Sequence, residues 1–236
     1  MAGVFVTGGS GFVGGALVSR LVSAGHAVRA LARSDEAAAA LADAGADPVR
    51  GDLHDIAALR AAVAGCELAY HAAALVSDWA PRVAFEHVNV EGTRNVIRAC
   101  EAAGVRRLVH VSSESAILSG RPLRGADETW PLQPRSRALY AASKARAELA
   151  IGKATGVETV IVRPVLVWGP GARTIRPGFA AAVREGRFTW IDGGRHLTST
   201  THVDNAVHGI LLAPNGAAPA RCTRSPTASR SASASS

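Results

Sequence analysis

The spacing of apolar residues changes repeatedly along the first two thirds of the chain. Short runs rich in Val, Leu and Ala predict six β-strands, at residues 4–7, 28–32, 48–50, 68–71, 108–112 and 159–163. Between them apolar residues recur every three or four positions, which predicts helices at residues 12–24, 35–44, 54–64, 85–103 and 137–155. Such alternation indicates an α/β fold, a doubly wound parallel sheet covered by helices on both faces.

Beyond residue 165 the pattern loosens, because glycines and prolines interrupt every short apolar run. We therefore expect a main domain over residues 1–165, followed over residues 166–213 by a partial lobe and a returning helix. Residues 214–236 are rich in Ser, Ala, Arg and Pro and have no apolar period. This composition predicts a disordered tail.

Composition narrows the class of protein. Apolar residues make up 48% of the 236, enough to bury a core, and no apolar run is long enough for a membrane span. The net charge of +7 comes from arginines scattered along the chain, so no nucleic-acid partner is expected. The three cysteines lack disulfide or metal-ligand spacing, so no metal site is expected. The first residues do not resemble a signal peptide, which predicts a cytoplasmic location.

A glycine-rich turn joins the first predicted strand to the first helix. Gly8, Gly11 and Gly14 allow a tight turn, a close backbone approach to a pyrophosphate and close packing of helix on strand. The helix N-terminus adds free N–H donors. A lone glycine triplet is weak and an ordinary loop is the alternative, but the strand–turn–helix context favours a Rossmann-type dinucleotide site. The residues expected to hold the cofactor here are Thr7, Gly8, Ser10, Gly11, Phe12, Val13 and Gly14.

The end of the second strand bears on the choice of nicotinamide cofactor. NAD sites usually place a carboxylate there, but this chain has Arg33 and Ser34, and no carboxylate before Asp35. A guanidinium can fork onto a 2′-phosphate and a serine hydroxyl can add a donor. NADP is therefore favoured and NAD is the alternative, as is a solvated loop arginine.

Two further strand ends face the same expected cofactor. Asp52 is placed to accept from an adenine amino group while Leu53 packs on the ring; the alternative is that Asp52 caps the following helix. We interpret His71 as a buried strand-end histidine rather than a catalyst. Small residues after it let the backbone lie against the cofactor: Ala72, Ala73 and Ala74.

Proton-transfer chemistry is indicated by Tyr140 and Lys144, which share one helix face at a spacing of four residues. A nearby ammonium lowers the pKa of a phenol, which can then exchange a proton with a substrate hydroxyl or carbonyl. Ser113, at the end of the fifth strand, can hold the same oxygen, with Ser112 as the alternative. The glycine-rich turn, the strand-end serine and the Tyr–Lys pair rarely follow one another along a chain by chance.

With these motifs the chain resembles the extended or atypical short-chain dehydrogenases/reductases of the NAD(P)-dependent epimerase/dehydratase superfamily. The matching segments are residues 7–14, 51–53, 71–73, 89–93, 140–144, 163–171 and 202–207. The resemblance implies that Ser113, Tyr140 and Lys144 are catalytic, with Asn89 in support. It also implies a nicotinamide pocket lined by Arg163, Pro164 and Val165. Glu114 departs from the family pattern.

Within that superfamily the chain looks most like the 3β-hydroxysteroid dehydrogenase and dihydroflavonol reductase groups. This implies an oxidoreductase that interconverts a secondary alcohol and a ketone, a small-molecule substrate and a homodimer. One alternative is a nucleotide-sugar epimerase or dehydratase with bound NAD, and a second is a cofactor-binding member with impaired catalysis. Because family members continue past the helix near residue 202, we expect a truncated substrate lobe, and we interpret the tail as a frameshift product.

Overall fold

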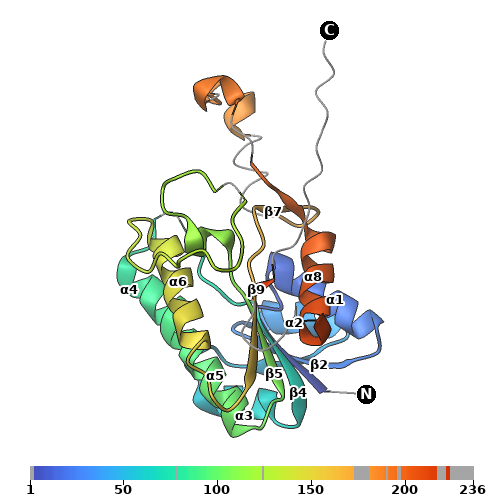
Figure 1. Cartoon of the computed structure of the whole chain (residues 1–236). Helices are drawn as coiled ribbons and strands as arrows, with labels where there is room; N and C mark the ends of the chain where they lie inside the picture. Colours follow the sequence, from blue (N-terminus) through green and yellow to red (C-terminus); the bar gives the residue numbers. More distant parts are fainter. Residues whose placement is uncertain are drawn as a thin grey trace.

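A parallel sheet lies at the centre of the computed structural model (Figure 1). Its strands, in spatial order, are β3 (Asp47–Arg50), β2 (Ala27–Ala32), β1 (Gly3–Thr7), β4 (Cys66–His71), β5 (Arg107–Val111), β6 (Glu158–Val162) and β9 (Cys222–Thr223). Every neighbouring pair is parallel. Chain order reverses between β1 and β4, the place where open α/β sheets bind ligands at their carboxyl edge. The predicted fold class is confirmed.

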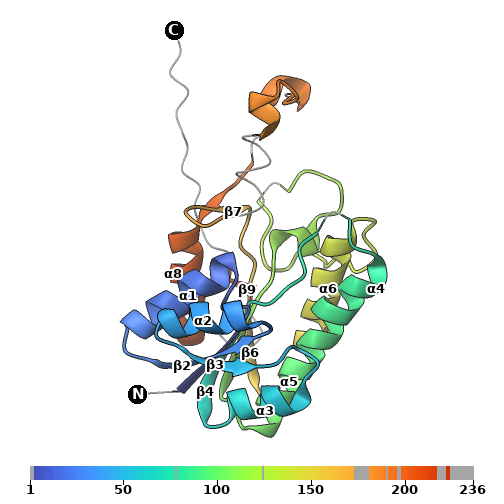
Figure 2. The ribbon, with the colours of Figure 1, turned by 180° about the vertical axis from the view of Figure 1, so that it is seen from behind.

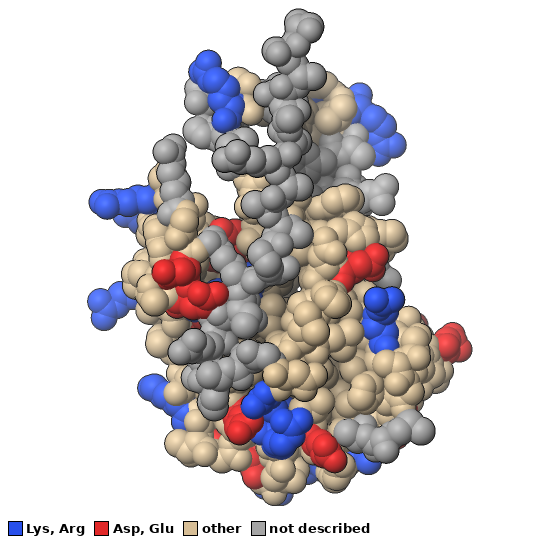
Figure 3. Space-filling view, turned by 45° about the vertical axis from the view of Figure 1, so that its right-hand side comes forward, with Lys and Arg blue, Asp and Glu red and all other residues tan. Residues whose placement is uncertain are grey.

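The structure describes residues 3–77, 79–123, 125–172, 181–189, 191–195, 198–216 and 222–223. In this part of the chain no helix combines the length and the apolar character that a membrane crossing needs. On the face in Figure 3, Lys and Arg side chains lie apart, with Asp and Glu between them, and the described residues form no basic stripe there.

Helices cover both faces of the sheet (Figures 1 and 2). The helices on one face are α1 (Phe12–Ser23), α2 (Asp35–Asp43) and α8 (Val203–Gly216). Those on the other are α3 (Ile56–Val63), α5 (Gly92–Ala102) and α6 (Leu139–Ile151). The pleat of β1 sends Val4 and Val6 into the first core and Phe5 into the second. Two apolar layers therefore hold the carboxyl edge of the sheet in place.

Three predicted helices differ from the structure, and one of them, predicted at 137–155, is shorter as α6 (Leu139–Ile151). The helix predicted from residue 54 begins at Ile56, because Asp55 rather than Asp52 caps it by accepting from the Ala58 amide at 2.9 Å. The helix predicted at 85–103 begins earlier, as α4 (Arg82–Phe85), and passes through a π-helical segment, η1 (Glu86–Glu91), before α5. The wider π turn carries Asn89, and such turns occur often at functional sites.

The remaining elements are short, apart from the returning helix. The 3₁₀ turn η2 (Glu114–Ile117) follows β5, β7 (Val167–Trp168) pairs with β8 (Thr201–His202), and η3 (Ile191–Gly194) lies between those two strands in sequence. Helix α8 returns onto the face that carries α1 and runs to Gly216, past the boundary predicted at 213. Within the predicted tail, residues 222–223 extend the sheet as β9 beside β6. Residues 217–221 and 224–236 lie outside the described part of the chain.

Candidate active site

The turn between β1 and α1 owes its shape to two glycines. Gly8 has a φ of +74°, and a Cβ there would lie 2.6 Å from the Ala73 amide nitrogen. A Cβ on Gly14 would lie 2.0 Å from the carbonyl oxygen of Gly8. Neither position can hold a side chain, because backbone atoms already fill the space. Gly8 thus brings the turn against the end of β4, and Gly14 brings α1 against the turn.

The third glycine leaves room on the outer side of the turn. A Cβ on Gly11 would meet only the Gly8 carbonyl oxygen, at 3.2 Å, and both Ser10 and Gly11 are exposed. Gly11 is also the N-cap of α1 and supplies no side-chain hydrogen bond, so the first N–H groups of the helix keep their donors. An open concave backbone with free donors fits the pyrophosphate of a dinucleotide. Phe12 and Val13, which were predicted to contact the cofactor, are partly buried and pack on the core beneath the turn.

A buried chain of hydrogen bonds runs from this turn across the sheet. The Ala73 amide donates to Thr7 Oγ1 at 3.3 Å, and Thr7 Oγ1 lies 2.7 Å from Nδ1 of His71. On the other side of the ring, Nε2 lies 2.8 Å from Thr93 Oγ1, which donates its own proton to the Asn89 carbonyl at 2.6 Å. Because the Thr93 proton is committed, Nε2 of His71 must carry the ring proton and Nδ1 must accept from Thr7.

Burial of His71, together with the charge of Lys144, lowers the pKa of the imidazole to about 3. The ring is therefore neutral, as the fixed tautomer requires. The interpretation of His71 as a buried strand-end residue holds, but no sequence pattern indicates that it links Thr7 to Thr93. Thr93, which joins His71 to the Asn89 carbonyl, was likewise not predicted, because these contacts connect residues far apart in the sequence.

Asn89 connects three elements from its position on η1. Its side-chain oxygen accepts from the Leu75 amide at 2.7 Å, and its amide group donates to the Leu75 carbonyl at 3.1 Å and to Ser143 Oγ at 2.9 Å. Ser143 in turn donates to the Tyr140 carbonyl at 2.7 Å. The supporting role implied for Asn89 thus has a definite form: it ties the loop after β4 to the helix that carries Tyr140.

Ser113 and Tyr140 come together at the carboxyl edge. The Ser113 side chain lies beside the Tyr140 phenol and acts to lower its pKa, although burial has the larger effect and raises it. Ser113 follows β5 and caps η2, while Tyr140 lies in the first turn of α6 against Phe85, with the ring centroids 6.5 Å apart. A phenol and a serine hydroxyl at one point can bind and protonate one substrate oxygen.

The Lys144 ammonium lies deeper than the sequence predicts. It is buried, donates to the Val111 carbonyl at 2.8 Å and lies 3.4 Å from Nε2 of His110. Burial lowers its pKa to about 8, with the charge of Glu148 opposing this shift. The predicted lowering of the Tyr140 pKa by Lys144 is not found: burial raises the pKa of the phenol, and the effect that opposes burial comes from Ser113. In this geometry Lys144 contacts the sheet and shares only a helix face with the phenol.

Ser112 points to a different place from Ser113. Its hydroxyl donates to Glu148 at 2.5 Å, and the same carboxylate forms a buried ion pair with Arg163, with a closest approach of 2.6 Å. The Ser112 alternative is therefore not favoured, because its side chain is already engaged away from Tyr140. Arg163, expected at the nicotinamide pocket, directs its guanidinium to α6 instead. Glu148 was not among the predicted site residues, although it follows Lys144 by four residues on the same helix face.

The residues predicted for the adenosine end lie at the ends of β2 and β3. Arg33 is exposed and has no ion-pair partner among the described residues, so its guanidinium is available. The Ser34 hydroxyl caps α2 by accepting from the Ala37 amide at 3.2 Å, which the sequence did not anticipate. Asp52 accepts from two following amides, at 2.7 and 3.1 Å, without capping α3. Leu53 is buried against the position of Gly92 rather than open to a ring.

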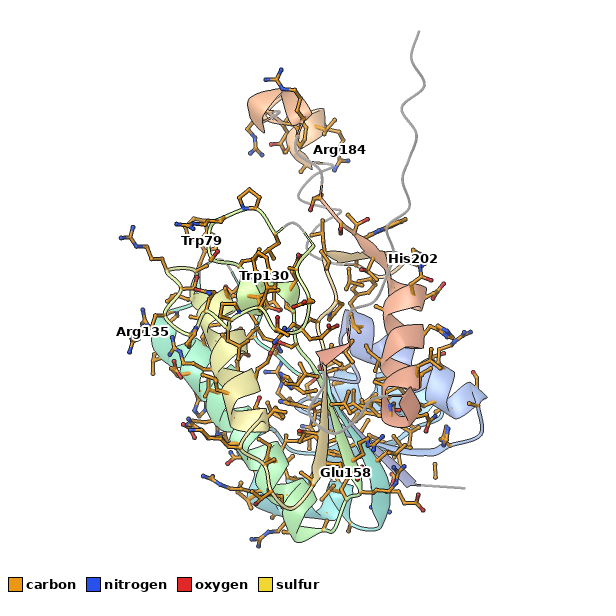
Figure 4. All side chains as sticks on the ribbon, in the orientation of Figure 1. Trp79, Trp130, Arg135, Glu158, Arg184 and His202 are labelled. Atoms are coloured by element: carbon orange, nitrogen blue, oxygen red, sulfur yellow. The ribbon has the colours of Figure 1, made fainter. Side chains whose placement is uncertain are left out.

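The other predicted contacts also lie along the carboxyl edge. The residues after β4 are half-buried beside the Gly8 turn: Ala72, Ala73 and Ala74. Pro164 is buried and its carbonyl accepts from the Glu114 amide at 3.3 Å, while Val165 is half-buried. Figure 4 shows Trp79 and Trp130 on loops above α4 and α6, with Glu158 at the opposite end of the sheet. The edge therefore gathers the cradle, the Ser113–Tyr140 pair and the ends of four strands.

Comparison with curated proteins finds relatives over most of the chain. A ketoreductase of Stigmatella aurantiaca, acting on 4-hydroxy-2-methyl-3-oxo-4-farnesyl-3,4-dihydroquinoline-1-oxide, is 46% identical over 89% of this chain and 63% of its own length. A 2-alkyl-3-oxoalkanoate reductase of Stenotrophomonas maltophilia is 39% identical over 92% of this chain and 66% of its own. The 3 beta-hydroxysteroid dehydrogenase/Delta 5-->4-isomerase of Mycobacterium tuberculosis is 35% identical over 92% and 62%. The chain thus spans about two thirds of these relatives.

Solved structures agree on the fold. DesIV of Streptomyces venezuelae, a dTDP-glucose 4,6-dehydratase with NAD and TYD bound, superposes with a TM-score of 0.82 at 26% identity, covering 94% of this chain and 75% of its own. The model of the 3-beta hydroxysteroid dehydrogenase/isomerase family matches residues 5–221. That match includes the cradle, the Ser113–Tyr140 pair and the returning helix. The chain belongs to the 3-beta hydroxysteroid dehydrogenase/isomerase family.

Proposed function

We propose that this chain carries the cofactor-binding and catalytic part of an NAD(P)-dependent oxidoreductase that interconverts a ketone and a secondary alcohol. The observation that carries the proposal is the Ser113–Tyr140 pair at the carboxyl edge, beside the glycine turn. The relatives named as reductases and dehydrogenases support this reaction class.

The nicotinamide cofactor would supply or take the hydride when bound. Gly11 and the uncapped N-terminus of α1 would bind its pyrophosphate. Ser113 then holds the substrate oxygen, and Tyr140 gives it a proton as the carbonyl is reduced or takes one in the reverse direction. The raised pKa of the phenol keeps it protonated at neutral pH, as a proton donor must be.

We further propose that the cofactor is NADP. Arg33 supports this choice because its guanidinium is exposed at the end of β2, where no carboxylate comes before Asp35, and the adjacent Ser34 caps α2. A charge-assisted bidentate contact between arginine and the 2′-phosphate contributes enough binding free energy to favour NADP over NAD. NAD in the solved structures belongs to those proteins and leaves this choice open.

The first test is a fluorescence titration of the chain with NADPH and, separately, with NADH. Arg33→Ala is expected to weaken NADPH binding about 10-fold or more and to leave NADH binding unchanged. Arg60→Ala, an exposed arginine on α3, is the matched control. Equal affinity for both cofactors in the unaltered chain would contradict the NADP proposal.

The second test measures NADPH oxidation with a 2-alkyl-3-oxoalkanoate, the substrate type of one relative. Tyr140→Phe is expected to lower kcat by roughly 10²-fold or more and to keep cofactor affinity within a few-fold. Equal turnover by Tyr140→Phe would overturn the role of the phenol. Conversion of dTDP-glucose without net NADPH consumption would instead support the epimerase or dehydratase alternative, which the likeness to DesIV favours.

A further inference from the structure

One carboxylate beneath the site is not used by the proposed chemistry. Glu148 lies one helical turn beyond Lys144 on α6, and its side chain is 1% exposed. Buried carboxylates are rare unless they are paired and hydrogen-bonded. This one has both kinds of partner, and each comes from a different strand.

The first partner directly follows β6 and the second directly follows β5. Arg163, directly after β6, donates to both carboxylate oxygens, at 3.0 and 3.1 Å from Nε and 2.6 Å from Nη2. Ser112, directly after β5, donates to Oε1 at 2.5 Å. The carboxylate therefore fastens two neighbouring strand ends to the helix that carries Tyr140.

The negative charge of the Glu148 carboxylate also offsets the positive charge of the Lys144 ammonium. The titratable groups that face the ammonium are His110 on β5 at 3.4 Å, His71 on β4 and Glu148 on α6, with Arg163 behind the carboxylate. Both histidines are neutral because burial and the Lys144 charge lower their pKa values. Among these groups the anion is Glu148, and its charge favours the protonated ammonium.

Strand geometry explains how this contact also orients the serines. Successive residues of an extended chain point to opposite sides. When Glu148 binds the Ser112 hydroxyl, the next residue, Ser113, is turned toward Tyr140, whose pKa it acts to lower.

We propose that Glu148 is a positioning residue: its carboxylate balances the charge of Lys144 and ties the end of β5 to α6. An active-site role for this arrangement rests on the proposed function. The ionisation of Lys144 itself can be measured without cofactor or substrate, so failure here and failure of the proposed function are distinguishable.

The chain has two lysines, Lys144 and Lys153, which makes a direct measurement practical. Lysine labelled with carbon-13 at the ε position gives two resonances, and Lys153→Arg assigns them. In the unaltered chain Lys144 is expected to titrate near pH 8. In Glu148→Gln its midpoint falls by about one pH unit, because the neutral amide no longer favours the ammonium.

Glu67→Gln is the matched control, since this exposed side chain on β4 has no ion-pair partner among the described residues. It should leave the Lys144 midpoint unchanged. If the role of Glu148 were purely structural, Glu148→Gln would lower the free energy of unfolding and leave the Lys144 titration midpoint unchanged. An unchanged Lys144 midpoint in folded Glu148→Gln would therefore overturn the proposal.

Removing one partner of a buried ion pair can prevent folding, so a second variant is needed. Glu148→Gln combined with Arg163→Gln removes both charges and leaves two amides in their place. The Lys144 midpoint should still fall, by less than in the single variant, because Arg163 no longer repels the ammonium. A midpoint equal to that of the unaltered chain would also overturn the proposal.

Discussion

Thr7 and His71 are joined by a hydrogen bond of 2.7 Å between the hydroxyl at the end of β1 and Nδ1 of the imidazole at the end of β4. Thr7 directly precedes the glycine turn, and His71 passes the chain of donors on to Thr93 and the Asn89 carbonyl. Every proton in this chain runs in one direction, so no member can change its protonation without breaking a neighbour's bond. The cofactor turn and the segment that supports Tyr140 are therefore one hydrogen-bonded unit.

Replacing this histidine tests the unit. In His71→Leu, the hydroxyls of Thr7 and Thr93 each lose their hydrogen bond to the imidazole inside the core, and we expect the free energy of unfolding to fall by about 2–4 kcal/mol. Urea unfolding followed by tryptophan fluorescence measures the change. His208→Leu, on the exposed side of α8, is the control and should cost far less. Equal stability of the two variants would show that the chain of hydrogen bonds contributes little.

The buried histidines also predict how stability depends on pH. The pKa of His71 is lowered to about 3, and that of His110 is held well below its ordinary value, by burial and by the Lys144 charge. Because the unfolded chain binds protons near pH 6.5 and the folded rings do not, stability is full above that pH and declines below it. Each ring contributes a slope of about 1.4 kcal/mol per pH unit.

Urea unfolding at several pH values between about 7 and 5 measures this slope, a range in which few carboxylates titrate. His110→Leu removes one of the two rings, so the slope should fall by about half. His110 suits this test because its Nδ1 is buried with no hydrogen-bond partner among the described residues. Identical slopes in the variant and the unaltered chain would contradict the assignment.

Two glycines of the turn should separate packing from cofactor binding. Gly14→Ala places a methyl group 2.0 Å from the Gly8 carbonyl oxygen, which the backbone can accommodate only by shifting, and we expect a loss of about 2 kcal/mol or more. Gly11→Ala meets that oxygen at 3.2 Å and should leave stability nearly unchanged while weakening NADPH binding about 10-fold. Thermal unfolding and cofactor titration of both variants provide the comparison. Normal NADPH affinity in Gly11→Ala would mean that the pyrophosphate binds elsewhere.

The two serines after β5 should differ in what they affect. Ser113→Ala removes the side chain that acts to lower the pKa of Tyr140, so the phenol should titrate at higher pH; Ser112→Ala should leave that titration unchanged. Ultraviolet absorbance of tyrosinate reports this, because the chain has two tyrosines and burial raises the pKa of the other, Tyr70, to about 12. A shift in Ser112→Ala but not in Ser113→Ala would reverse the assignment.

The local pattern was sufficient for the fold. Strand runs and helix periods depend on neighbouring residues, so their alternation predicted the parallel sheet, and Gly8, Gly11 and Gly14 marked the turn. Helix ends were less well predicted, since Asp52 and Asp55 are both plausible caps and only the folded chain shows that Asp55 accepts from the Ala58 amide. The Tyr140–Lys144 spacing correctly indicated a shared helix face.

The class of fold, the cofactor turn and the residue types of the site could be read from the amino-acid order, because each depends on spacing along the chain. Which serine lies beside Tyr140, where the Lys144 ammonium lies and what Arg163 binds became evident only in the folded chain. Those outcomes depend on Glu148, His71 and His110, which come from separate elements and meet only when the strands align. Contacts between distant segments have no period in the sequence, and the charge and burial that they impose arise only on folding.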